Sequence, residues 1–329
     1  MKAGKISETV LKRSVFKQLH TVHPSVRKGP GVGIDSSVFQ IGAGQNLVLS
    51  MNPVTFGITE IGTRGVYKAL NNIAVMGAEP IGVMASLLLP TCYSENELRD
   101  LIHELDKACE ETSATVLGGH TEVVRGITQP IITITGAGIA DQENDISSGN
   151  AKPGMDVIVT KWIGLEGTAI LANEKEEALG QRYSQPFINK AKKFLDYISI
   201  QSEAAVATKS GVGAMHDISQ GGIFAALWEM AESAGVGLEI DLKKIPIRQE
   251  TVEICEFFDL NPYKILSGGS LLIAAEDGNT LVRELERIGV SAVIVGKTTD
   301  SNDRVLLCED ERRFLELPQT DELHKGMEK

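Results

Sequence analysis

The sequence predicts an α/β protein of α+β character that is built from two domains. Three observations indicate this: a length of 329 residues, alternating helical and strand patterns in both halves, and one polar stretch near the middle. Domains usually hold about 100 to 200 residues, so two domains fit this length. The polar stretch, DQENDISSGNAKPG over residues 141–154, has the composition of a linker. We therefore expect an N-terminal domain over 1–145 and a C-terminal domain over 151–329.

The first half contains both periodicities. Apolar residues at helical spacing predict helices, and short β-branched runs predict strands. The helix after Ser94 is the clearest, because Ser94 and Glu97 have the spacing of a capping box. The expected helices are 1–20, 60–77 and 95–112, and the expected strands are 46–50, 81–89, 114–117 and 130–140.

The second half repeats the alternation. A helix over 223–234 is expected to end at Gly235, which suits a left-handed cap. The segment MHDISQGG at 215–222 is expected to be a turn that leads into this helix. Strands are expected at 156–161, 236–241, 269–275, 291–297 and 304–308, and further helices within 172–200 and around 248–258 and 279–288.

Composition excludes several classes of function. The net charge of −12 argues against a broad basic face for nucleic acid. No apolar run approaches the roughly 18 residues that span a membrane, and the N-terminus does not have the uninterrupted apolar stretch of a signal peptide. The four cysteines have no paired spacing, so we expect reduced thiols in a cytoplasmic protein.

A glycine-rich segment, GPGVGIDSS at 29–37, is the first candidate site. Gly31 and Gly33 would expose main-chain N–H groups to phosphate, and Asp35 would ligate a cation beside them. Asn52 follows the next expected strand, and Asn72 interrupts an apolar helix. The structural alternatives are an ordinary glycine turn and an asparagine that satisfies nearby main-chain groups.

The segment VLGGHTEVV at 116–124 is the second candidate. Gly118 and Gly119 would let the main chain approach a ligand closely, at a turn that ends the expected strand. This turn would display His120, Thr121 and Glu122.

The third candidate is HDISQGGI at 216–223. Here a helix begins just after Asp217, Ser219 and the pair Gly221 and Gly222. Free N–H groups at a helix N-terminus form a natural anion site. Ser219 would instead serve as a simple helix cap in the structural alternative.

Taken in order, these segments resemble the aminoimidazole ribonucleotide synthetase superfamily over residues 29–310. NNIAVMGAEP resembles its Asn-Asp-(Leu/Val)-x-x-x-Gly-Ala-x-Pro helix, and GIDSS its Gly-x-Asp-(Asp/Ala)-Ala loop. LGGHTEV is similar to its Gly-Gly-(Glu/Asp/His)-Thr turn, and HDISQGGI to its Asp-x-(Ser/Thr)-x-Gly-Gly helix start. The stretch KIPIRQETVEICEFFDLNPYKILSGGSLLIA is closest to the hydrogenase-maturation dehydratase (carbamoyl dehydratase) branch.

The resemblance implies ATP-dependent chemistry. ATP would phosphorylate an amide or carboxyl-type oxygen, or a phosphate, of a small molecule, while metal ions held by aspartates neutralise the triphosphate. It also implies a mixed N-terminal sheet that pairs with its twofold mate in a homodimer. The dehydratase ends in a reactive cysteine, whereas this sequence ends in HKGMEK, so self-modification of a terminal thiol is not expected.

The sequence departs from the family pattern at the metal site. Asn52 and Asn72 stand where the resemblance predicts aspartates, and His120 stands where most branches have an acidic residue. Magnesium prefers anionic oxygen ligands, and imidazole favours transition metals. We therefore expect weak or absent Mg²⁺ binding.

Two functions follow from this resemblance. The first is an ATP-dependent enzyme with Asp217 and His120 as catalytic residues. The second is a non-catalytic relative that binds a nucleotide or metabolite through a degraded metal site. In both, the metal ligands would be Asp35, Asn52, Asn72 and His120. The cofactor contacts would be Gly31, Gly33, Asp35, Asn52, Asn72, Gly118, Gly119, Thr121, Glu122, Gly221 and Gly222.

Overall fold

The computed structural model describes Glu8 and residues 26–28, 31–34 and 36–329. The helix expected over 1–20 therefore lies outside the described residues, apart from Glu8, and so does Asp35. The chain divides into two compact units. The N-terminal unit contains residues 26–28 and 36–144, and the C-terminal unit contains residues 31–34 and 145–329. The domain boundaries at 145 and 151 stay predictions.

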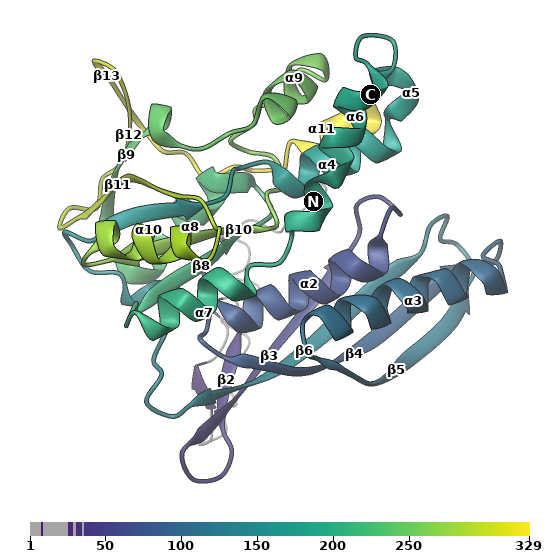
Figure 1. The fold of residues 1–329 in the computed structure, drawn as a ribbon, viewed down its shortest axis with the longest axis horizontal. Coiled ribbons are helices and arrows are strands. Elements are labelled where there is room, and N and C mark those ends of the chain that lie inside the picture. The colour runs from purple at the N-terminus through teal and green to yellow at the C-terminus, as the bar shows by residue number, and fades with distance from the viewer. Residues whose placement is uncertain (1–7, 9–25, 29–30, 35) are drawn as a thin grey trace. The chain divides into compact units, whose positions relative to one another are not determined.

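The N-terminal unit is a six-stranded sheet with helices on one face (Figure 1). Its strand order is β1-β2-β3-β6-β4-β5, and only the pair β4 and β5 is parallel. The strands are β1 (Val26–Lys28), β2 (Ser37–Gln40), β3 (Gln45–Val54), β4 (Glu79–Pro90), β5 (Thr115–Val124) and β6 (Ile131–Asp141). The helices are α2 (Ile61–Ala74) and α3 (Glu95–Glu111).

Helix α2 lies close to the central strand β6. A Cβ on Gly138 would lie 2.3 Å from Ile73 Cγ2, and one on Gly136 would lie 3.2 Å from Ala69 O. Only glycine permits this approach, because a larger residue would push the helix off the sheet. The capping box of α3 is confirmed: Ser94 Oγ accepts from Glu97 N, and Glu97 accepts from Ser94 N.

The C-terminal unit is built on a seven-stranded sheet of order β13-β12-β9-β11-β7-β10-β8. Its strands are β7 (Asp156–Thr160), β8 (Ala214–Ile218), β9 (Gly237–Asp241), β10 (Ser270–Ala275), β11 (Ala292–Thr299), β12 (Arg304–Cys308) and β13 (Glu311–Phe314). Its helices are η3 (Ser148–Asn150), α4 (Leu165–Glu174), α5 (Glu176–Leu179), α6 (Gln185–Lys192), η4 (Lys193–Tyr197), α7 (Gln201–Lys209), α8 (Gly222–Ala234), η5 (Leu242–Lys244), α9 (Gln249–Phe257), α10 (Gly278–Arg287) and α11 (Leu323–Glu328).

The core of this unit lies on both faces of its sheet. Val157 and Val159 of β7 pack in one cluster with α8, while the intervening Ile158 is also fully buried. Strands buried on both faces appear in sequence as continuous apolar runs, as in β7 and β10. The five strands expected in this half are confirmed. Helix α8 ends at Gly235, which has the predicted left-handed conformation.

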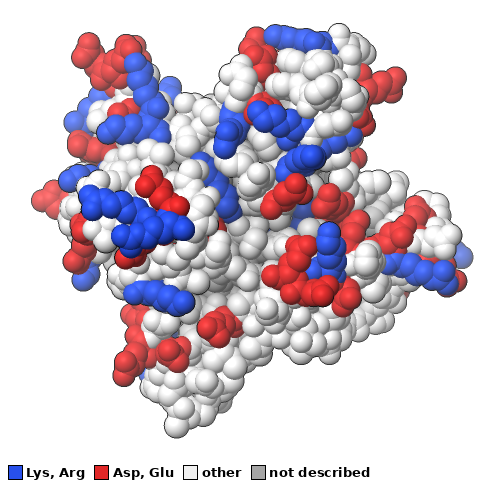
Figure 2. Space-filling model, in the orientation of Figure 1, with Lys and Arg blue, Asp and Glu red and all other residues white. Residues whose placement is uncertain are grey.

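One expectation for the connecting segments is wrong. Residues 215–218, expected within a turn, belong to the edge strand β8, in which every residue is buried. The boundary between the two units follows Asn144, within the expected linker over 141–154, which begins in β6 and contains η3. Among the described residues, no helix combines the length and apolarity needed to cross a bilayer. Figure 2 shows acidic and basic side chains interspersed on one face of the molecule.

Candidate functional site

A cluster of uncharged polar side chains joins β3 to α2. Asn52 Nδ2 donates to Ser50 Oγ at 3.0 Å, and Asn72 Nδ2 donates to the same oxygen at 3.1 Å. Ser36 Oγ donates to Asn72 O at 2.8 Å. Ser36, Ser50 and Asn72 are buried and Asn52 is half-buried. The structure therefore brings together Asn52 and Asn72, two of the four predicted metal ligands.

This cluster has one acceptor without a donor. Asn72 is 8% exposed, and its Oδ1 is buried without a hydrogen-bond partner in the described part of the chain. A buried carbonyl oxygen left without a donor costs about 1–3 kcal/mol. Within residues 26–28, 31–34 and 36–329, no group of three or more His, Cys, Asp or Glu is arranged to hold a metal ion. Asp35, the one predicted carboxylate ligand, lies outside the described residues.

The segment around His120 is not a turn, and this expectation is wrong. Residues 115–124 form the edge strand β5, which runs through Gly118 and Gly119 in parallel with β4. A Cβ on Gly119 would lie 2.0 Å from Ala85 O, so glycine is required for this strand pairing. Around Gly118 there is open space. The sequence signal was misinterpreted because paired glycines are common in turns and rare in strands.

The strand register separates His120 from the asparagines. Asn52 lies opposite Ile134, Ile134 opposite Ala85, and Ala85 opposite Gly119. Three strand spacings of about 4.8 Å place residues at the two ends of this row about 14 Å apart. His120 is the neighbour of Gly119 along β5. Within one copy of the chain, His120 therefore cannot share a metal ion with Asn52 and Asn72, and the four-ligand set stays a prediction.

The two groups also lie on opposite faces of the sheet. His120 is opposite Ser86, which is exposed, whereas the row of Asn52 includes the buried Ile134 and Ala85. Because side chains alternate along a strand, Asn52 faces the helices and His120 faces the open side. His120 Nε2 lies 3.3 Å from Glu122 Oε2, and both side chains are exposed.

A groove of about 560 Å³ lies between α3 and strands β4 and β5. Residues 118–121 of β5 line its strand side. Of these, Thr121 is opposite the buried Leu87 and faces the helix, whereas His120 borders the groove from the other face of the strand. The helix side of the groove contains polar residues that the sequence analysis did not single out. They are Arg99, His103 and Asp106. Arg99, His103 and Asp106 are four and three residues apart in the sequence, a spacing that indicates one shared face of a helix.

The described part of the glycine-rich segment packs on the C-terminal unit. Gly33 has φ +68°, and a Cβ there would lie 2.7 Å from Glu229 O of α8. Ser148 Oγ donates to Gly33 O, and Ile34 N donates to Gly31 O at 3.3 Å. Gly33 is therefore explained by close packing, and phosphate binding by Gly31 and Gly33 stays a prediction.

The start of α8 already holds an anion that belongs to this chain. Gly221 N donates to Asp321 Oδ2 at 2.7 Å, and Gly222 N donates to Ser219 O at 3.1 Å. A Cβ on Gly222 would lie 2.6 Å from Tyr263 O. The N–H groups expected to contact a ligand are thus engaged within the protein. Nothing in the sequence marks Asp321 among the polar residues of the C-terminal segment.

Asp217 lies in β8, opposite Leu271 of β10, rather than in a turn. It is 8% exposed and precedes the loop that contains Ser219. Its neighbour His216 lies within 3.1 Å of Glu229 Oε2 of α8, and both side chains are largely buried. Asp217 is therefore held in the edge strand β8, two residues before Ser219, which begins the loop that leads into α8 (the α8 loop).

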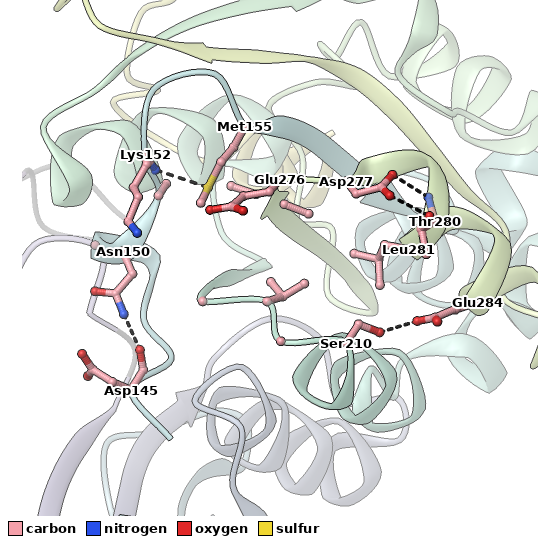
Figure 3. A pocket seen from close by; sticks show the side chains of 17 residues that line it. Asp145, Asn150, Lys152, Met155, Ser210, Glu276, Asp277, Thr280, Leu281 and Glu284 are labelled. Atoms are coloured by element: carbon pink, nitrogen blue, oxygen red, sulfur yellow. Dashed lines mark hydrogen bonds between the residues drawn. The ribbon is translucent and has the colours of Figure 1, made fainter. Parts of the chain in front are cut away.

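A second cavity, of about 790 Å³, lies in the C-terminal unit (Figure 3). Asp277 caps α10 through Thr280 N at 3.0 Å, and Ser210 Oγ donates to Glu284. The labelled carboxylates in Figure 3 outnumber the basic side chains, of which Lys152 is the one labelled. None of the predicted site residues lines this cavity.

Comparison with known proteins gives matches to both halves of the chain. The model of the AIR synthase related protein, N-terminal domain, matches residues 33–140. The model of the AIR synthase related protein, C-terminal domain, matches residues 152–309.

Several curated relatives are similar to this chain over most of their length. A putative hydrogenase expression/formation protein of Methanocaldococcus jannaschii is 29% identical, over 92% of this chain and 91% of the relative. The carbamoyl dehydratase HypE of Rhizobium leguminosarum bv. viciae is 27% identical, over 80% of this chain and 76% of the relative.

Solved structures share the fold. HypE of E. coli superposes with a TM-score of 0.75 at 19% identity, over 92% of this chain and 95% of that one. A hydrogenase maturation protein HypE in complex with ATP has a TM-score of 0.72 at 17% identity, over 98% and 97% of the two chains. A ThiL protein complexed with AMPPCP and TMP has a TM-score of 0.65 at 19% identity, over 88% and 91%.

Proposed function

Because the chain belongs to the AIR synthase related family, we propose that it binds a nucleotide at the polar cluster of Ser50, Asn52 and Asn72. The observation that carries this proposal is the buried oxygen Asn72 Oδ1, which has no donor among the residues that the structure describes. A ligand that donates an N–H or O–H group to this oxygen removes the cost of burying it. Relatives of known structure have been solved with ATP and with AMPPCP, which supports a nucleotide as the ligand.

The described residues of the cluster do not fit an ordinary magnesium site. They supply two amide groups and two hydroxyl groups, whereas Mg²⁺ prefers carboxylate and phosphate oxygens in octahedral geometry. His120 lies three strands away, on the other face of the sheet. We therefore infer that nucleotide binding depends little on Mg²⁺, and that this chain is a binding relative with a degraded metal site.

An ATP-dependent enzyme is the second candidate function. It would activate an amide or carboxyl-type oxygen, or a phosphate, of a small molecule, with Asp217 and His120 as catalytic residues. Asp217 favours this candidate, because its carboxyl group lies two residues before the α8 loop and is largely buried. The resemblance by itself favours an enzyme, whereas the uncharged cluster favours the binding relative. Release of ADP in the presence of candidate substrates distinguishes the two functions.

Restoring the carboxylates tests the metal-site proposal. In the variant Asn52→Asp/Asn72→Asp, two carboxylates face Ser50 Oγ, whose single hydrogen satisfies only one of them. We expect this variant to be less stable than the wild type in EDTA, and Mg-ATP to raise its melting temperature by several degrees. A ligand at about 100 times its Kd stabilises a fold by about 2.7 kcal/mol. The wild type should respond equally to ATP with Mg²⁺ and with EDTA.

Asn46→Asp is the matched control. Asn46 also lies on β3, is 5% exposed, and has a buried Oδ1 without a partner. It is not hydrogen-bonded to Ser50, so its variant should lose stability without rescue by Mg²⁺. If Mg-ATP stabilises the wild type by several degrees more than ATP with EDTA does, and the double variant (or one that adds His120→Asp) gains nothing further, the degraded-site proposal is wrong.

We also propose that the chain forms a homodimer through the open face of its N-terminal sheet. Met51, Thr135 and Met84 lie in one row across this face, and Met51 and Met84 are 67% and 51% exposed. Large exposed apolar patches usually mark an interface, and an obligate twofold interface buries on the order of 2,000 Å² or more. Met84→Lys should shift the mass measured by light scattering from dimer to monomer. A monomeric wild type at micromolar concentration would contradict this.

A further inference from the structure

The hydroxyl group of Ser50 sets the orientation of two asparagine side chains. Its Oγ accepts from Asn52 Nδ2 at 3.0 Å and from Asn72 Nδ2 at 3.1 Å. A serine oxygen has two acceptor lone pairs, so these two bonds fill both of them. The donor end of each amide therefore points at Ser50, and its carbonyl oxygen, Oδ1, points away from Ser50.

Both carbonyl oxygens are left to accept. Asn72 Oδ1 is buried without a partner in the described part of the chain. The side chain of Asn52 makes a single hydrogen bond to the described residues, the one to Ser50. Ser50 and Asn72 are 5% and 8% exposed, whereas Asn52 is half-buried. The cluster thus opens toward solvent at Asn52, and a ligand group that enters there meets hydrogen-bond acceptors.

No Lys or Arg of the described residues is hydrogen-bonded to these asparagines. Arg64 and Lys68 precede Asn72 on α2, but both are directed elsewhere. The Arg64 guanidinium donates to three main-chain oxygens of the turn between β3 and α2, and Lys68 Nζ donates to Pro53 O at 3.5 Å. The carbonyl oxygens therefore carry their partial negative charge without a cation from the described residues beside them.

The phosphate groups of a nucleotide do not fit such a surface. At neutral pH their oxygens are ionised, so they accept hydrogen bonds and repel other acceptors. The nucleoside part is different, because its ribose hydroxyls and the amine of adenine donate. A donor from this part satisfies Asn72 Oδ1 and removes the cost of burying that oxygen alone.

We infer that the cluster of Ser50, Asn52 and Asn72 recognises the nucleoside part of its ligand through a neutral hydrogen-bond donor, and that it does not bind the phosphate groups. The inference rests on the proposed nucleotide site and states which part of the nucleotide the cluster holds. Ser50 is a positioning residue, since it accepts both amide donors and so leaves both carbonyl oxygens to the ligand. The resemblance alone implies the opposite arrangement, with metal-bound phosphate at positions 52 and 72.

Calorimetry on the wild-type protein in EDTA tests the inference with ATP, adenosine and inorganic tripolyphosphate. We expect adenosine and ATP to have Kd values within about 3-fold of each other, and tripolyphosphate neither to bind nor to compete with ATP. Two analogues identify the donor: 2′,3′-dideoxyadenosine lacks the ribose hydroxyls, and purine riboside lacks the amine. The analogue without the recognised donor should bind about 10-fold more weakly or worse, because it leaves a buried acceptor unpaired.

The outcomes separate the two proposals. If ATP binds while adenosine does not, or if tripolyphosphate displaces ATP, the cluster holds phosphate; the nucleotide site then stands and this inference is wrong. Full affinity for both analogues would also overturn it. Binding of adenosine without binding of ATP would instead support the inference and contradict the nucleotide site. These measurements need no variant, so they do not depend on whether a mutated protein folds.

Ser50→Ala tests the positioning role. Without the shared acceptor each amide can turn its Nδ2 toward the ligand, so the penalty for the weaker analogue should shrink, an effect that a loss of stability alone does not produce. Ser50→Thr retains a hydroxyl and should restore the penalty. Asn46→Ala is the matched control, because Asn46 also lies on β3 with a buried, unpartnered Oδ1 but is not bonded to Ser50; its penalty should equal that of the wild type. A wild-type penalty in Ser50→Ala would show that Ser50 does not orient the amides.

Discussion

The buried ion pair between Lys161 and Glu203 gives the sharpest prediction for stability. Lys161 Nζ lies 2.7 Å from Glu203 Oε1, with side-chain exposures of 10% and 0%. The ammonium group also donates to Tyr197 O at 3.0 Å and to Gly269 O at 2.8 Å. Burial lowers the pKa of Lys161, and Glu203 opposes this shift. The pair therefore joins the end of β7 to η4 and to the loop before β10.

Lys161→Met should lower the free energy of unfolding by about 3–5 kcal/mol, the usual cost of leaving one partner of a buried ion pair alone. Methionine fills a similar volume, so little of this loss comes from a cavity. Lys161 has φ 54°, and methionine retains whatever backbone strain this causes. Urea unfolding at pH 7 measures the change. Adding Glu203→Gln should recover part of the loss, because the isolated charge is then removed.

Lys243→Met is the matched control. Lys243 pairs with Glu309, and their side chains are 58% and 70% exposed; exposed pairs contribute about 0–1 kcal/mol. If Lys161→Met costs no more than Lys243→Met, or if the losses of Lys161→Met and Glu203→Gln simply add, then the pair is not coupled as the structure indicates.

Three further predictions follow. Gly119→Ala should cost at least about 2 kcal/mol more than Gly118→Ala in urea unfolding, because both glycines have a positive φ but only the first places a Cβ against β4; equal losses would refute the explanation by strand pairing. If the protein is an enzyme, Asp217→Asn should lower turnover with little change in nucleotide affinity, whereas Asp35→Asn should weaken nucleotide affinity. Equal losses of nucleotide affinity in the two variants, measured by calorimetry, would contradict these separate roles. The raised pKa of Asp321, about 6, means that the folded state holds an extra proton between about pH 4 and 6. The free energy of unfolding should therefore fall as pH rises through this window, by on the order of 3 kcal/mol, and Asp321→Asn should abolish this slope.

The sequence predicted the elements whose signals are local. The capping box of Ser94 and Glu97 defined the start of α3, and Gly235 defined the end of α8. Strand β6 alternates buried and partly exposed residues along its length, so its period of two was visible in the sequence. In each case, residues within one turn or one strand determine the structure.

Strands β5 and β8 were missed because pairing partners far along the chain determine them. Gly118 and Gly119 are local signals of a turn, but the register with β4 extends the strand through them. Asp217 lies in a polar, glycine-flanked segment, but pairing with β10 makes it part of a sheet. The separation of His120 from Asn52 also follows from register, which no single segment reveals. Within one copy the register separates His120 from the asparagines, so whether the motifs form one site stays a prediction.

The turn between β3 and α2, which positions Asn52 and Asn72, is well ordered by hydrogen bonds. This bears on the proposal that the two residues stand where the family has aspartates. The guanidinium group of Arg64 is 1% exposed and donates to Phe56 O at 2.7 Å, Gly57 O at 3.0 Å and Thr59 O at 2.9 Å. These bonds fix the turn between β3 and α2, and Glu104 Oε2 accepts from Gly62 N at 3.0 Å to fasten the start of the helix. If the family pattern has aspartates at positions 52 and 72, as the resemblance implies, their replacement by asparagine changes two side chains and leaves this frame in place. None of the bonds that fix the turn involves Asn52 or Asn72, so Asn52→Asp/Asn72→Asp should need no rebuilding of the turn.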